Sequence, residues 1–221
     1  MIRTSLCILG WLVAGAANAA NPLVDVEGGN IVCHSGGRTT FLTRDGQNSE
    51  PVLSSDGQTI AFIHHLKSNS DPEFPQEAIH ALWIGNCRTG KAHQLRAPTS
   101  ANDIFASVGH PVFSLEGGYV YVSLAPGGDS LIIRQVSVST GQQKFVANAG
   151  LVGVFRNGPY RGYLLATQHT DLTDAHGNHF GGYPYYIFKP NGQIVTRIAD
   201  SETWDDKTLK GWLSQKGWRI W

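Results

Sequence analysis

The chain has 221 residues, and its 17 basic and 17 acidic side chains give a formal net charge of zero. This balance argues against the basic surface that nucleic acids or anionic membranes require. A hydrophobic fraction of 41% is enough for a packed core, and 26 glycines with 10 prolines favour many short strands over long helices.

The first nineteen residues are predicted to be a secretory signal peptide. Arg3 is the only charged side chain ahead of the apolar run 6–17, and Ala17-Asn18-Ala19 is a small-residue cleavage pattern. The run is too short to span a bilayer, and no later stretch is long and apolar enough to do so. We therefore expect residues 20–221 to be one domain, periplasmic or secreted, without a membrane span.

Two cysteines, Cys33 and Cys87, remain after removal of the signal peptide. In an oxidising compartment a disulfide between them is the simplest expectation. Two buried free thiols are the alternative.

Glycine-containing turns recur about every fifty residues, at Gly37, Gly90, Gly141 and Gly192. A β-rich run lies on each side of every turn, which is typical of a β-hairpin. A second pattern of strand, polar turn and strand precedes the later hairpins, at residues 51–62, 111–122 and, less clearly, 154–165. Together they give four strands per unit, which predicts an all-β fold, a small β-propeller of about four four-stranded blades.

One stretch contains, in chain order, Leu42-Thr43, Glu50-Pro51, Ser54-Ser55-Asp56-Gly57 and Ile60-Ala61-Phe62. This pattern resembles the repeat of TolB-type β-propellers, which shows Leu-Thr, Pro, Ser-Pro-Asp-Gly and an apolar strand. Ser55 stands where the family has Pro, and Glu116 of the second copy stands where it has Asp. The resemblance covers roughly residues 40–125. It implies a fold and not an activity, because such propellers serve as periplasmic scaffolds, peptidase-associated domains and lyases.

The unit spacing assigns blades to about residues 50–96, 109–147 and 151–199, and leaves 30–42 as the outer hairpin of a first blade. TolB-type propellers usually have six or more blades. We expect the C-terminal tail to complete the first blade, because a free edge strand is a liability. An open partial propeller closed by dimerisation is the alternative.

The tail, residues 204–221, is predicted to form a short helix followed by a strand. Asp205 or Asp206 can cap the helix, and Gly217 can end it. The tail residues Trp212, Trp218 and Trp221 are expected to pack on the propeller and close it, or else to anchor a partner protein.

Two long insertions are the candidate binding regions. The densest polar cluster lies within residues 169–179, and its candidate ligand-binding or metal-binding residues are His169, Asp171, Asp174, His176 and His179. These side chains suit zinc or another divalent cation, although a plain solvated loop is the alternative. The insertion 67–77 is expected on the same face, with Asp71, Glu73 and Phe74 as candidate rim residues. His64 and His65 are adjacent on a predicted strand, so their side chains point to opposite faces and cannot easily share a metal ion. His80, His93 and His110 stand alone and are interpreted as surface or core residues.

The leading functional hypothesis is an exported β-propeller that binds another envelope or extracellular protein, or a ligand, without catalysis. The sequence holds no nucleophile elbow, phosphate-binding loop or dinucleotide motif. The alternative is a metal-assisted hydrolase or lyase acting on carbohydrate or peptide through the histidine-rich insertion. No cofactor is predicted, though a divalent metal would fit that alternative. No nucleic-acid partner is expected, and a dimer would fit an open propeller.

Overall fold

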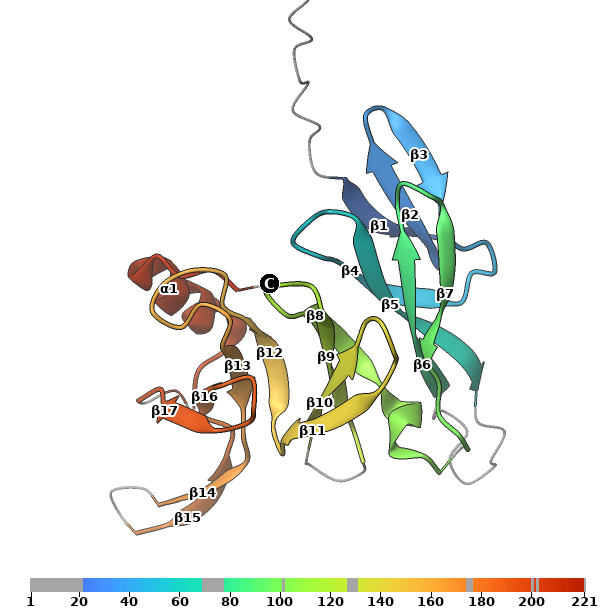
Figure 1. Cartoon of the computed structure of the whole chain (residues 1–221). Helices are drawn as coiled ribbons and strands as arrows, with labels where there is room; N and C mark the ends of the chain where they lie inside the picture. The colour runs from blue at the N-terminus through green and yellow to red at the C-terminus, as the bar shows by residue number, and fades with distance from the viewer. Residues whose placement is uncertain are drawn as a thin grey trace, which may run out of the picture.

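The computed structural model describes residues 22–68, 78–100, 102–126, 131–173, 177–199, 201 and 203–220. The predicted signal peptide, residues 1–19, lies outside this part of the chain. The described residues form short antiparallel strands with one α-helix near the C-terminal end, which confirms the all-β expectation (Figure 1). No helix among them has the length and hydropathy needed to cross a membrane.

Four sheets follow one another along the chain, each with its strands in sequence order. The first sheet contains β1 (Leu23–Glu27), β2 (Asn30–Ser35) and β3 (Arg38–Phe41). The second contains β4 (Asn48–Leu53), β5 (Thr59–Ser68), β6 (Ala78–Asn86) and β7 (Lys91–Arg96). The third contains β8 (Gly109–Phe113), β9 (Tyr119–Leu124), β10 (Ile132–Ser137) and β11 (Gln143–Ala147).

The fourth sheet contains β12 (Gly150–Val154), β13 (Leu164–Thr167), β16 (Tyr185–Phe188) and β17 (Ile194–Arg197). A separate two-stranded ribbon, β14 (Thr170–Thr173) with β15 (His179–Gly182), extends from it. A short 3-10 helix, η1 (Ile104–Ser107), precedes the third sheet, and α1 (Asp206–Lys216) follows the fourth. The three four-stranded antiparallel sheets are propeller-like blades, as the repeat predicts.

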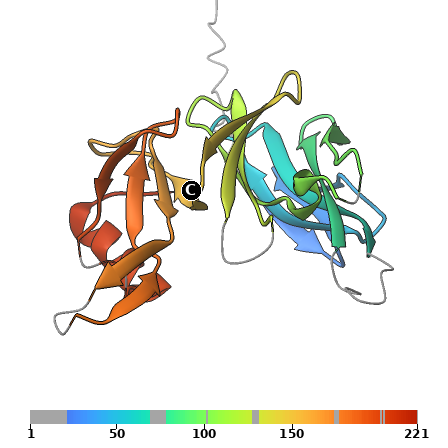
Figure 2. The same ribbon diagram turned by 90° about the horizontal axis from the view of Figure 1, so that it is seen from below.

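The sheets are arranged in an open arc, with the first and fourth sheets at opposite ends (Figure 1). The view from below shows the fourth sheet and α1 on one side and the first three sheets on the other (Figure 2). Apolar side chains fill the spaces between successive sheets: Ile31 and Phe62 lie between the first two, and Ile63 and Phe113 between the next two. The first strands β4, β8 and β12 are edge strands of their sheets, and neighbouring ones contact each other. These three strands therefore form the inner side of the arc.

The recurring turn glycines have a packing reason. Gly141 has a φ of +68°, and a Cβ there would collide with the carbonyl of Leu95 in β7. Gly192, with a φ of +89°, lies in the same way against the carbonyl of Val146 in β11. Each hairpin turn thus packs on the outer strand of the preceding sheet, and no side chain fits between them.

The same contact identifies which strand is missing from the first sheet. Gly90 lies against Thr40 of β3, so β3 occupies the outer position that β7 and β11 occupy in their sheets. Gly37 has open space around it, because no described sheet precedes the first one. The first sheet therefore lacks the inner strand that β4, β8 and β12 supply to the others, and β1 is its innermost strand.

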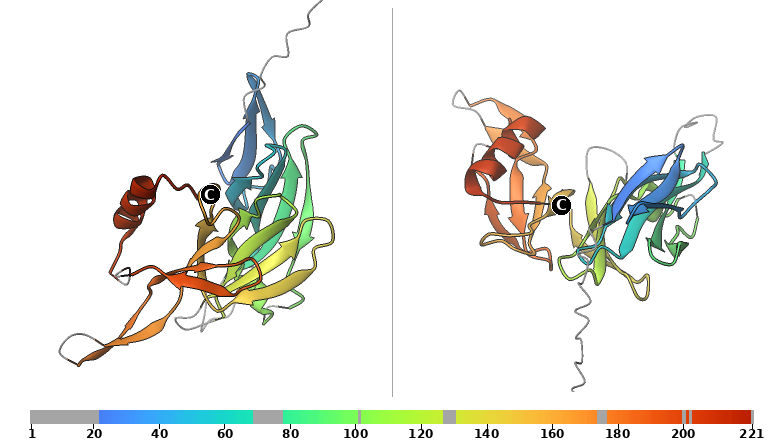
Figure 3. Two further views of the ribbon diagram at one scale, coloured as in Figure 1. Left: turned by 60° about the vertical axis from the view of Figure 1, so that its left-hand side comes forward. Right: turned by 90° about the horizontal axis from the view of Figure 1, so that it is seen from above.

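The expectation that the tail completes the first sheet is wrong. The third strand of that sheet comes from β1, and the tail packs on the fourth sheet instead (Figure 3). Leu209 and Leu213 of α1 are buried against this sheet, in one cluster with Leu165 and Ile187. The physical reason is that the last face of the fourth sheet is apolar and the described part of the chain holds no further sheet to cover it.

The rest of the tail also joins the fourth sheet. Ile220 forms an antiparallel bridge with Phe155, just beyond β12. The helix has the predicted caps: the Asp205 carboxylate accepts from the Thr208 amide at 2.8 Å, and Gly217 has a φ of 68°. Trp212 and Trp218 are half-buried in the same cluster, and Trp221 lies outside the described residues.

Candidate functional site

The predicted histidine-rich insertion is in part the ribbon β14–β15. His169 and Asp171 are exposed at its base and on β14, and His179 lies on β15. Asp174 and His176 are outside the described residues, as are the predicted rim residues Asp71, Glu73 and Phe74. In the described part of the chain, no three His, Cys, Asp or Glu side chains are grouped so that they could share a metal ion.

His169 has a packing role at the base of this ribbon. Its ring lies directly against Gly181, where a Cβ would collide with Nε2, and it meets the ring of Tyr183 edge-on at 5.3 Å. A cleft of about 200 Å³ lies beside it, between the third and fourth sheets. His169 thus shapes a small polar cleft.

The inner side of the arc carries a groove of about 280 Å³. Its walls are residues 50–52 of β4, 110–112 of β8 and 151–152 of β12. The strand pairing is irregular at each of these places, since every inner strand has a register shift there. We call this site the inner groove.

Backbone strain is concentrated at the inner groove. Among the described residues, the non-glycine positions with positive φ are Glu50 and His110, both at 51°. Each is followed by a proline, and the two are joined because the His110 amide donates to Glu50 Oε2 at 2.6 Å. A left-handed residue that is not glycine costs about 1–2 kcal/mol. Such strain persists where neighbouring structure enforces it, typically at functional sites.

A cluster of imidazoles lies next to the groove. The Ser49 hydroxyl and His65 Nε2 are 3.0 Å apart, and the rings of His65 and His80 meet edge-on at 4.6 Å. His80 Nδ1 is 3.0 Å from the carbonyl of Val108, so this nitrogen carries a proton and donates it. The cluster links β4, β5 and β6 to the start of β8.

Burial lowers the pKa of His65 below its ordinary value, and electrostatic repulsion between its charged form and the imidazoles of His80 and His64 lowers it further. The carboxylate of Glu50 acts in the opposite direction. His65 is therefore neutral at neutral pH and can accept a hydrogen bond or a proton.

Sequence reasoning missed this cluster because it treated His80 as isolated and considered His65 only with its chain neighbour His64. Register places His65 directly opposite His80. The signal available in the sequence was that both residues border the same insertion, so a hairpin closing that insertion brings them together.

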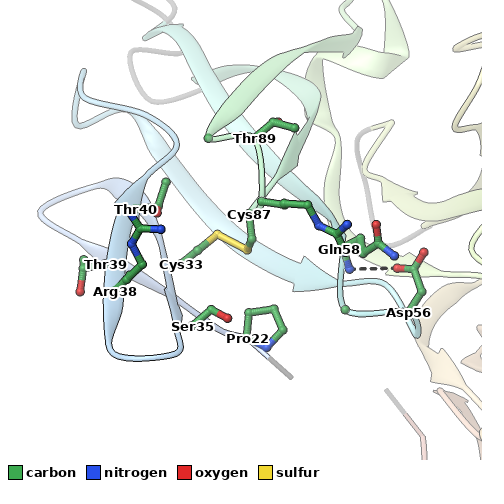
Figure 4. Close-up of a pocket in the computed structure, with 13 residues that line it drawn as sticks. Pro22, Cys33, Ser35, Arg38, Thr39, Thr40, Asp56, Gln58, Cys87 and Thr89 are labelled. Carbon is green, nitrogen blue, oxygen red and sulfur yellow. Dashed lines mark hydrogen bonds between the residues drawn. A yellow bond between two sulfur atoms is a disulfide. The ribbon is translucent and has the colours of Figure 1, made fainter. Parts of the chain in front are cut away.

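The predicted disulfide is confirmed, with the Cα atoms of Cys33 and Cys87 5.7 Å apart. It lines a cleft of about 620 Å³ between the first hairpin and the turns of the second sheet, where Arg38 and Pro22 also lie (Figure 4). Asp56 has a lowered pKa because the Ser54 hydroxyl and the Gln58 amide donate to it, at 2.6 and 2.9 Å. Asp56 therefore stabilises its own turn, and the disulfide fixes the first sheet to the second.

Comparisons with known proteins support the fold. No known family description and no curated protein sequence matches the chain. Among solved structures, TolB from Acinetobacter baumannii is similar with a TM-score of 0.53 and 17% identity, over 81% of this chain and 42% of TolB. The tricorn protease is similar with a TM-score of 0.54 and 14% identity, over 78% of this chain and 15% of that protein. An oligogalacturonate lyase in complex with manganese is similar with a TM-score of 0.50 and 16% identity, over 80% of this chain and 44% of the lyase.

The chain spans less than half the length of each of these proteins. At such identities the likeness concerns the arrangement of the strands, and two of these proteins, a protease and a lyase, already differ in activity. These comparisons show that the chain has an all-β, propeller-like fold, similar to part of TolB and of the other two proteins.

Proposed function

We propose that this protein is an exported binding module that holds an extended segment of another envelope or extracellular protein in the inner groove. The observation that carries the proposal is the pair of strained residues, Glu50 and His110, joined to each other in the groove wall. The fold does not need this strain, since β12 forms its share of the wall without a positive φ. A conformation kept at a stability cost is best explained by what it presents to a ligand.

The groove suits a polypeptide. The register shifts leave residues 50–51, 110–111 and 152 of the three edge strands without strand partners. The His110 amide is bonded to Glu50 and the two prolines have no amide hydrogen, so it is the remaining peptide groups that can hydrogen-bond to an extended chain. Pro51 and Pro111 keep such edges from pairing indiscriminately, as prolines on edge strands do. Glu50 and His110 are exposed and add a carboxylate and an imidazole for selectivity. The predicted signal peptide and the disulfide support export.

Site-specific photo-crosslinking in cells tests this proposal. A photoreactive residue replaces Val152, which is half-buried in the groove wall, and a matched control replaces Lys144, which is exposed on the outer strand β11. We expect a protein adduct from position 152 that a Glu50→Lys substitution abolishes, and none from position 144. Equal adducts from both positions, or none from position 152, would refute the groove as the binding site.

A hydrolase is the second candidate, favoured by one observation. The 3.0 Å contact of Ser49 with a neutral His65 matches the spacing of a nucleophile and its base. In such a reaction the Ser49 oxygen would bond to an acyl carbon while its proton passes to His65, which then protonates the leaving group. Covalent labelling by a serine-reactive phosphonate, lost in Ser49→Ala, would support this reading. Absence of labelling would exclude it.

A further inference from the structure

The free edge of β1 carries a further inference. β1 is the innermost strand of the first sheet, where the other three sheets have one strand more. Among the described strands, β1 pairs in its sheet only with β2. Figure 1 shows it on the side of the sheet that faces the interior of the arc. Unpaired strand edges of this kind are templates for another strand.

The hydrogen-bonding state of β1 agrees with an available edge. The Val26 amide donates to the carboxylate of its neighbour Asp25 at 2.7 Å, so it points away from β2. Because backbone direction alternates along a strand, the Val24 amide lies on the same edge. Leu23 and Val26 keep 66% and 37% of their surface exposed, which is much for apolar side chains beside a core. An added strand would pair with these amides and cover both side chains.

Charge decides which strand fits. Asp25 and Glu27 lie on β1, and the nearby strand β4 carries Glu50. These carboxylates favour an incoming strand with basic side chains. A second copy of β1 fits poorly, because antiparallel pairing centred on Asp25 would place like charges opposite each other.

We propose that β1 accepts an extended, basic segment of a partner protein as the missing inner strand of the first sheet. This inference rests on the proposed binding function and names a second contact for the same partner. The added strand would continue the row formed by β4, β8 and β12, so one extended segment can occupy the β1 edge and approach the inner groove. Main-chain hydrogen bonds would supply affinity, and alternate side chains would supply selectivity.

The test uses the mature protein and a short peptide of alternating lysine and valine. Binding should slow hydrogen exchange of the Val24 and Val26 amides by about tenfold or more, while outer-strand amides keep their rates. A peptide of alternating glutamate and valine should bind at least about tenfold more weakly, the effect of roughly 1.4 kcal/mol. Protection confined to other strands, or equal binding of the acidic peptide, would overturn the proposal.

A proline substitution separates edge pairing from general attraction. Val26→Pro removes an amide that β2 does not use, so the sheet should persist while peptide binding falls about tenfold or more. Val26→Thr keeps the amide and should bind normally. If Val26→Pro does not fold, a lysine–valine peptide with N-methylated bonds replaces it and should fail to bind. Unchanged binding in both cases would refute the inference.

This result is independent of photo-crosslinking at Val152. Exchange protection at β1 without an adduct at position 152 would retain the edge site and reject the groove. An adduct without protection would do the reverse.

Discussion

Glu50 and His110 have a positive φ that the surrounding sequence does not predict. A residue before proline normally has an extended backbone with negative φ. The pairs Glu50-Pro51 and His110-Pro111 therefore predict regular extended conformation at the start of each strand. The structure instead places both residues at a φ of 51°, within the register shifts of β4 and β8. Tertiary contacts impose this conformation, among them the hydrogen bond from the His110 amide to Glu50.

Substitutions at His110 test that strain. Glycine adopts positive φ without a Cβ clash, whereas alanine does not, so His110→Gly should be more stable than His110→Ala by about 1 kcal/mol. Urea unfolding of the two variants gives this difference directly. We also expect His110→Gly to lose the groove adduct, since the imidazole is absent. Equal stability of the two variants would mean that the residue is not strained.

His65 predicts a pH dependence of stability. Its folded pKa lies below the ordinary value of 6.5, so between these two values the unfolded chain binds more protons than the folded one. The free energy of unfolding is therefore fully retained above about pH 6.5 and falls as the pH drops toward the folded pKa. His65→Gln should show a smaller loss between about pH 7 and pH 5 in urea titrations. An identical loss in both proteins would contradict this account.

At the scale of elements, the turns and the disulfide follow from the sequence, and the partner of the tail does not. The spacing of Gly90, Gly141 and Gly192 reflects a contact between successive sheets, so it reports the repeat directly. The caps at Asp205 and Gly217 likewise fix the helix by local chemistry. Which apolar face the helix covers depends on the uncovered face of the fourth sheet, which is a property of the assembled arc.

The disulfide should contribute substantially to stability. Its two cysteines are 54 residues apart, and the chain-entropy relation gives about 4 kcal/mol for a loop of this size. Cys33→Ser with Cys87→Ser should lower the free energy of unfolding by roughly that amount. Thiol counting under denaturing, non-reducing conditions should find no reactive thiol in the mature wild-type protein. Two thiols per chain would show that the bridge does not form.

Truncation after Asp205 tests the role of the helix as a cover for the fourth sheet. It would expose Leu165 and Ile187, which are buried together with Leu209 and Leu213. Burial of apolar surface stabilises by about 25 cal/mol per Å², so losing the burial of these side chains should lower the melting temperature sharply or leave the protein insoluble. Lys210→Ala, at an exposed position of the same helix, is the control and should melt as the wild type does. An unchanged melting temperature after truncation would contradict the covering role.

At the scale of the whole molecule, the two outermost sheet faces of the arc differ in what covers them. α1 covers the last face of the fourth sheet, and the far face of the first sheet carries the paired side chains Glu27 and His34, 3.4 Å apart. Neither face presents an apolar sheet of the kind that closes a ring. We therefore expect the mature protein to sediment as a monomer. A dimer that persists at low concentration would show that the arc closes against a second copy.

The repeat in the sequence predicted the all-β fold and the four-stranded sheets, since strand length and turn chemistry are local. The inner groove could not be found in this way. It consists of residues from β4, β8 and β12, which are distant in sequence and meet only because the sheets stack. Sequence reasoning instead selected the histidine-rich insertion, where polar residues are adjacent in the chain.

The central claim is that the inner side of the arc binds an extended partner segment. NMR titration of the isotope-labelled mature protein with the segment recovered from the Val152 adduct tests it most directly. We predict that the largest shift changes fall at residues 50–52, 110–112 and 151–152, and that Glu50→Lys removes them. Shift changes confined to the outer strands or to the β14–β15 ribbon would contradict the account.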